Sequence, residues 1–178
     1  MTEAKVGEQF IKHELDEAIA IQRSIVKAEE SLGRDHPSRS TKQMILETLK
    51  KDQQFLRELE SLGRPKGATG KAEEVATALD ELATQTTEKA AEAKSEAYEA
   101  HAVLLNLKRK QQDSAAAMIK IAGAMKDTEM KAAATKFERE TKASAQALSA
   151  ELAALAVEIA RQGATVGAGR GSGSRSRS

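Results

Sequence analysis

The stretch Lys126-Asp-Thr-Glu-Met-Lys131 stands at the start of the longest periodic run of apolar and small residues in the chain. The carboxylate of Asp127 can accept a hydrogen bond from the backbone N–H of Glu129 or Met130, and its negative charge suits the N-terminus of a helix. We therefore expect a helix that begins after Asp127 and continues to about Arg161. Its inward face recurs every three or four residues, at Met130, Ala134, Phe137, Thr141, Ser144, Leu148, Leu152, Leu155 and Ile159.

A helix of this length is not stable on its own and needs other helices to cover its apolar face. The preceding sequence predicts further helical segments with these approximate bounds: Glu3 or Glu8 to Leu32, Ser38 or Ser40 to Gly63, Lys71 to Lys94, and Ser95 to Met125. We expect Gly33 to end the first of them, and the short turn that follows favours an antiparallel helical hairpin. The third segment is weakly apolar, and it either continues as an exposed helix or breaks near Thr86 and Thr87.

Composition sets the class of protein. The chain has 178 residues, of which 40% are hydrophobic and only 2% aromatic, and no stretch alternates as a half-buried strand does. This pattern predicts one all-α domain with an aliphatic, alanine-rich core. The 28 basic and 27 acidic residues nearly balance, so the body is not built to bind nucleic acid as a whole. The chain has no cysteine, and we found neither a signal-peptide pattern nor a window apolar enough to span a membrane, so we expect a cytoplasmic protein.

The C-terminal segment differs from the rest of the chain. From residue 163 to residue 178 it consists of Gly, Ser, Ala, Arg, Thr and Val, without an acidic residue. We therefore predict a helical domain over residues 1–162 and a disordered tail over residues 163–178. Arg170, Arg175 and Arg177 could bind nucleic acid weakly and in a salt-sensitive way, although a solvated tail is the favoured interpretation.

Polar residues interrupt the apolar stripes of three expected helices. Gln22 and Asp52 occupy positions where an apolar residue is expected in the first and second helices. A buried carboxylate needs a partner, so we predict that these two side chains form a hydrogen-bonded pair. The cluster Lys108-Arg-Lys110 interrupts the apolar face of the fourth helix, and we interpret it as a solvated surface.

Metal-binding residues are the alternative explanation for inward polar groups in a helical bundle. The chain lacks the Glu-x-x-His spacing that is typical of di-iron bundles, and it has no motif of a phosphate-binding loop or of a serine nucleophile. The candidates for a variant di-metal site are Glu14, Asp52, Glu99, His101 and Glu140. We favour the polar pair over the metal site, because only Asp52 among the candidate carboxylates falls on an apolar seam.

Three stretches resemble a known family, the small bacterial ferritin-like proteins associated with stress. They are Leu15–Val26, Leu49–Glu60, and the junction within Met118–Leu148 that contains Lys126-Asp-Thr-Glu. The resemblance implies a ferritin-like antiparallel four-helix bundle, with the third segment as an extra shorter helix. Carried over, the metal positions of the family fall on or near Gln22, Lys51, Phe55, Arg109, Gln111, Glu140 and Thr141.

Of these positions only Glu140 offers a ligand for a hard cation, and lysine or arginine would repel one. The resemblance therefore implies a bundle that has kept its fold and lost its di-iron centre. We expect a non-catalytic, stress-associated structural or interaction protein without a cofactor, able to form a homo-oligomer through an alanine-rich face. The alternative is an iron-binding carboxylate protein with ferroxidase-like activity, so enzymatic activity stays open at this point.

Overall fold

The computed structural model describes residues 3–71 and 74–168, and within them every regular element is a helix. The all-α prediction is confirmed. The elements are α1 (Glu3–Asp35), α2 (Arg39–Gly63), the 3-10 turn η1 (Arg64–Lys66), α3 (Glu74–Lys89), α4 (Lys94–Met125) and α5 (Thr128–Ala168).

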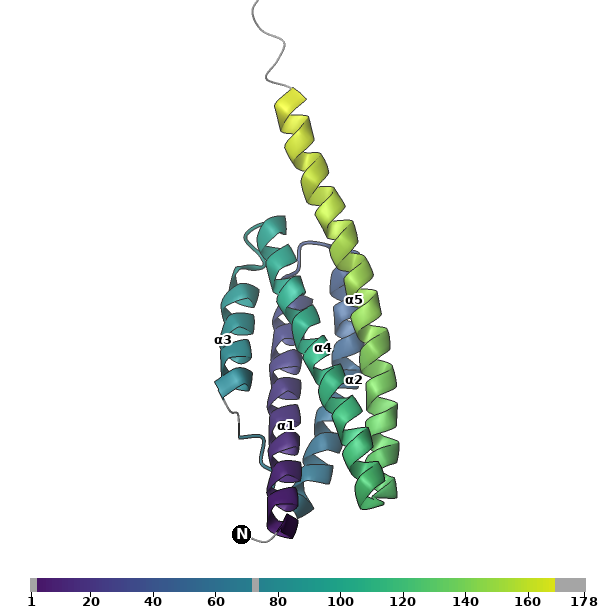
Figure 1. Cartoon of the computed structure of the whole chain (residues 1–178). Helices are drawn as coiled ribbons and strands as arrows, with labels where there is room; N and C mark the ends of the chain where they lie inside the picture. The colour runs from purple at the N-terminus through teal and green to yellow at the C-terminus, as the bar shows by residue number, and fades with distance from the viewer. Residues whose placement is uncertain (1–2, 72–73, 169–178) are drawn as a thin grey trace, which may run out of the picture.

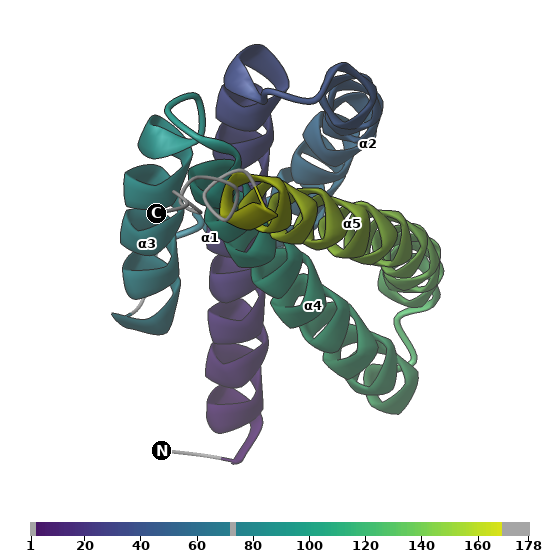
Figure 2. The same cartoon turned by 90° about the horizontal axis from the view of Figure 1, so that it is seen from above.

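The long helices form two hairpins. α1 packs against α2, α4 packs against α5, and the two hairpins meet mainly where α4 lies along α1 (Figure 1). The short helix α3 covers α1 and α4 on the side away from α2 and α5, as the view from above shows (Figure 2). α2 and α5 touch each other at only a few positions, so a groove remains between them.

The start of α5 follows the sequence prediction. The backbone N–H of Met130 donates to Oδ1 of Asp127 at 2.9 Å. This hydrogen bond, helped by Lys66 at 3.1 Å from the other carboxylate oxygen, holds the pKa of Asp127 below its usual value. Lys126 adopts a left-handed conformation, with φ of 58°, and reverses the chain between α4 and α5.

The end of α1 differs from the sequence prediction, and α3 takes one of the two alternatives that the sequence left open. α1 does not end at Gly33 but continues to Asp35. Gly33 instead lets α2 approach closely, because a Cβ atom there would lie 2.7 Å from Cδ2 of Leu46. α3 runs through Thr86 and Thr87 without a break, and the two hydroxyls donate back to carbonyl oxygens one turn earlier.

α5 is longer than expected and extends beyond the end of the bundle (Figure 1). It continues to Ala168, past the predicted end near Arg161, whereas residues 169–178 and the three tail arginines lie outside the described residues. The stretch Thr128–Gln162 is long and apolar enough to cross a membrane by length and composition alone, and 17% of its most apolar window is buried inside the bundle. The prediction that no window is apolar enough to span a membrane is therefore wrong by this measure. The stretch is rich in alanine, which counts as apolar in a hydropathy average but adds little apolar surface. This explains why the prediction and the hydropathy of the helix differ.

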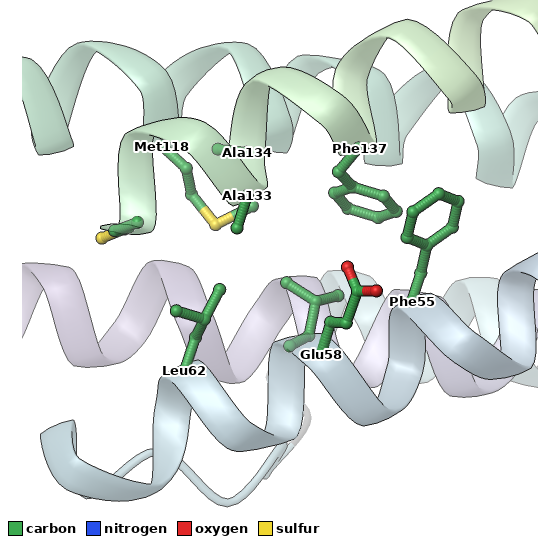
Figure 3. A pocket seen from close by; sticks show the side chains of 9 residues that line it. Phe55, Glu58, Leu62, Met118, Ala133, Ala134 and Phe137 are labelled. Carbon is green, nitrogen blue, oxygen red and sulfur yellow. The ribbon is translucent and has the colours of Figure 1, made fainter. Parts of the chain in front are cut away.

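The core is divided into two apolar clusters. One contains Ile21, Ile25 and Leu104, and the other contains Leu15 and Met118. The second cluster borders the groove between α2 and α5, where the rings of Phe55 and Phe137 lie 4.8 Å apart (Figure 3). Buried polar side chains from α1, α2 and α4 occupy the junction between the clusters, at Gln22, Glu29, Asp52, Lys108 and Gln111.

Candidate functional site: a buried lysine between two carboxylates

Lys108 is fully buried in the middle of the bundle and contacts two carboxylates from two other helices. Its Nζ atom lies 2.7 Å from Oε1 of Glu29 on α1 and 2.5 Å from Oδ2 of Asp52 on α2. The side chains of Lys108 and Glu29 have no exposed surface, and that of Asp52 is 5% exposed. Three helices are therefore joined through one ammonium group.

Neutral side chains complete this lysine–carboxylate cluster. Gln22 donates through Nε2 to Oδ1 of Asp52 at 2.8 Å and to the backbone oxygen of Asp52 at 3.0 Å. Gln111 in turn donates to Oε1 of Gln22 at 3.1 Å, and Thr48 donates to Oε1 of Glu29 at 2.8 Å. The predicted pair of Gln22 and Asp52 is thus found, but as part of a larger network.

The charges of the cluster do not balance when every group is ionised, because two carboxylates face one ammonium. Burial, together with the charge of Asp52, raises the pKa of Glu29 to about 8, against the opposing attraction of Lys108. Burial alone would lower the pKa of Lys108, but the two carboxylates outweigh it and the pKa is raised. At neutral pH a proton on Glu29 therefore leaves the ion pair of Lys108 and Asp52 as the charged part of the cluster.

The interpretation of Lys108-Arg-Lys110 as a solvated surface is wrong for its first residue. Arg109 is exposed, and Lys110 reaches the surface, where its Nζ lies 2.9 Å from Glu17. The signal for Lys108 was present in the sequence. It lies on a stripe with three- and four-residue spacing that runs through the buried residues His101, Leu104, Lys108, Gln111, Ala115, Met118 and Ala122.

The structure does not bring the five candidate metal ligands together. Asp52 belongs to the cluster, Glu99 is exposed on α4, and Glu140 lies half-buried beside the groove between α2 and α5. His101 is buried elsewhere, against Leu148 of α5. Glu14 lies near the surface of α1, where its carboxylate and the side chains of His13 and Glu17 place ligand atoms within 4.8 Å of one another.

The di-iron centre implied by the family resemblance does not fit the residues present. Lys51 and Arg109 are exposed, Phe55 is packed against Phe137, and Gln111 is bonded to Gln22. The carboxylates nearest to the bundle centre, Glu29 and Asp52, already share the ammonium of Lys108. The ammonium of Lys108 therefore already provides the positive charge between these two carboxylates.

No protein-family model, curated protein or solved structure matches the chain. The resemblance to the ferritin-like family therefore stays a prediction that rests on the three sequence stretches. What the chain does has to be argued from its own buried and exposed residues.

Proposed function

We propose that the chain is a non-catalytic ferritin-like bundle in which the ammonium of Lys108 takes the place of a metal ion. The observation that carries the proposal is the position of Nζ, 2.7 Å from Glu29 and 2.5 Å from Asp52. A metal in the same position would meet the charge of Lys108, and it would have to displace a buried ion pair. The protein would then act through its surface, as a structural or interaction protein.

The surface that best fits this role is the exposed face of α5. Its small residues recur at alternating spacings of four and three, at Ala143, Ala147, Ala150, Ala154 and Val157, and all are exposed. Small residues at this spacing let two helices approach closely along a shared seam. The stripe lies on the part of α5 that packs on the bundle, since Leu148 and Leu155 between its members are buried. We propose that a second copy of the chain covers it.

Iron oxidation tests the non-catalytic assignment. Ferrous iron is added in air to the purified chain, and both the uptake of iron and the rate of its oxidation are measured. We expect oxidation at the rate of protein-free buffer. Saturable uptake of two irons per chain, as in a di-iron bundle, with accelerated oxidation would overturn the proposal.

Sedimentation analysis tests the self-association. The wild-type chain should sediment as an oligomer, and Ala154→Glu should shift it to the monomer by burying a charge in the seam. Lys142→Glu changes an exposed residue of α5 outside the stripe and is the matched control. A wild-type chain that is monomeric at all concentrations tested would end this part of the proposal.

A further inference from the structure

Two buried histidines meet at the end of the bundle where α5 begins to extend beyond it. His36 lies in the turn between α1 and α2, with 5% of its surface exposed, and His101 lies on α4 with none. Their ring centroids are 6.1 Å apart and the rings are nearly perpendicular. They do not belong to the lysine–carboxylate cluster.

Each imidazole has one ring nitrogen at a backbone carbonyl and one without a partner. Nε2 of His101 lies 3.0 Å from the carbonyl oxygen of Leu148, and Nδ1 of His36 lies 3.3 Å from that of Ser38. The remaining atoms, Nδ1 of His101 and Nε2 of His36, are buried, and within the described residues neither has a hydrogen-bond partner. Buried polar atoms of this kind are rare in native proteins and call for a water molecule, an ion or another ligand.

The contacts of His101 are those that metal-binding histidines adopt. A ligating imidazole usually donates its second N–H to a carbonyl or carboxylate, which fixes the tautomer and points the free lone pair at the metal. A bond from Nε2–H of His101 to Leu148 leaves the lone pair on Nδ1, the unpartnered atom. Nδ1 of His36 lies 3.3 Å from the carbonyl oxygen of Ser38 and 3.1 Å from its backbone nitrogen, so it donates to the first in one tautomer and accepts from the second in the other. Only the tautomer with the proton on Nδ1 leaves the lone pair on Nε2, and a bound metal ion would select it.

Glu151 is the acidic side chain that could become a third ligand after a movement of its carboxylate, since among the described residues only His13, Glu14 and Glu17 place three ligand atoms within 4.8 Å of one another. Glu151 is half-buried on α5, one turn after Leu148, and its Oε2 accepts a hydrogen bond from Thr41 of α2 at 2.9 Å. Its charge acts on both histidines, favouring the protonated form of each, although burial dominates and lowers the pKa of His101 to about 4. Both imidazoles are therefore neutral at pH 7, the form that binds metal.

We propose that His36, His101 and Glu151 bind one divalent transition-metal ion, of the zinc or cobalt type, and so tie the turn between α1 and α2 to α4 and α5. Two imidazoles and one carboxylate are a ligand set that zinc uses, with water as the fourth ligand. With metal–nitrogen distances of about 2.1 Å, two rings on one tetrahedral ion have centroids roughly 5 Å apart. The ion would draw the two rings together by about 1 Å, and Glu151 would turn toward it.

Cobalt binding tests this site. The full-length chain, stripped with a chelator, is titrated with cobalt chloride while the visible absorption of four-coordinate cobalt is followed, and zinc chloride is then added to displace it. We expect one cobalt per chain. His36→Gln, which changes a residue in a turn, and Glu151→Gln should each weaken binding by at least about tenfold, the smallest loss expected even for an outer-shell partner.

The control is the surface group on α1. His13→Gln removes the imidazole of the group formed with Glu14 and Glu17, and it should leave the cobalt absorption unchanged. Circular dichroism verifies that each variant is folded. The proposal is overturned if the wild-type chain binds no four-coordinate cobalt, if binding is unchanged in His36→Gln, or if it is lost in His13→Gln. Neither result decides the iron experiment, because Lys108 still occupies its own site.

Discussion

The bundle buries polar side chains in two regions, the lysine–carboxylate cluster and the histidine pair, and the two regions differ in how these side chains are partnered. In the lysine–carboxylate cluster, three helices contribute charged groups that bind one another, and Gln22, Gln111 and Thr48 donate further hydrogen bonds. Oε2 of Glu29 and Oε1 of Gln111 have no hydrogen-bond partner among the described residues. At the histidine pair, the two imidazoles share no hydrogen bond, and each keeps a buried nitrogen without a partner among the described residues. In the first region the buried charges neutralise one another, whereas in the second each imidazole keeps a ring nitrogen that a ligand could occupy.

The difference shows that burial alone does not mark a binding site. Lys108 and His101 are both without exposed surface, and both lie on the same stripe of α4. Lys108 has its charge neutralised by two partners, and truncating it would leave carboxylates alone in the interior. His101 is held on one side only, and its open lone pair costs energy until a ligand occupies it. The distinction between the two regions therefore rests on the pairing of buried charges, because buried atoms without a hydrogen-bond partner occur in both.

The largest effect is expected from Lys108→Met, which removes the shared cation and keeps most of the side-chain volume. Glu29 and Asp52 then have no positive partner in the core, and breaking a buried ion pair in this way costs about 3–5 kcal/mol. Chemical denaturation at pH 7 measures the free energy of unfolding. Lys120→Met, an exposed lysine on the same helix, is the matched control and should change it by less than about 0.5 kcal/mol.

A triple variant separates charge from packing in this result. When Glu29 and Asp52 are replaced by Leu together with Lys108→Met, no charge remains in the interior. Apolar replacement of a whole buried ionic group is often neutral or stabilising, so most of the lost free energy should return. A triple variant as unstable as Lys108→Met would mean that Lys108 stabilises the bundle through its shape and packing. The difference between the cluster and the histidine pair would then not be electrostatic.

A smaller effect, visible only as a pH dependence, is expected from Glu29→Gln. In the unfolded chain Glu29 loses its proton near its ordinary pKa of 4.5, whereas in the folded chain it holds the proton until about pH 8. Between these values the folded state binds more protons. The stability contributed by Glu29 is therefore complete below about pH 4.5 and is lost as the pH rises toward 8.

Glutamine has no proton to lose, so the variant should lack this decline. Unfolding curves at pH 5.5, 7 and 8.5 for both chains give the comparison, and the wild-type chain should lose stability relative to Glu29→Gln at each step. Glu30→Gln changes the exposed neighbouring glutamate and should follow the wild-type curve. Parallel curves for the wild type and Glu29→Gln would show that Glu29 is ionised throughout, as a simple partner of Lys108.

The sequence predicted the local features of this fold well. The helix after Asp127 starts where the cap requires it, because an N-terminal cap is decided by a few neighbouring residues. The pairing of Gln22 with Asp52 was also predictable, since both interrupt an apolar stripe. Asp52 alone, however, did not reveal its charged partner, which comes from a position 56 residues away in the sequence.

Lys108 and the histidine pair were missed for a physical reason. A lysine between an arginine and another lysine resembles a solvated surface, and only the packing of α1 and α2 against α4 shows that it is neutralised. His36 lies in a turn, where no helical periodicity places it, and it meets His101 only because α1 continues past Gly33 to Asp35. Contacts between distant segments decide both regions.

The smallest effect is expected from His36→Gln in the metal-free chain, and this variant tests the metal site proposed at the histidine pair. The imidazole is neutral and makes hydrogen bonds only within its own turn, so its loss should change the free energy of unfolding by about 1 kcal/mol or less. With excess zinc the gap between the wild type and the variant should widen, by about 2.7 kcal/mol at a free zinc concentration 100 times the dissociation constant. A gap that stays constant as zinc is added would place His36 outside any metal site. A large loss without metal would show that His36, like Lys108, is already stabilised by contacts within the chain.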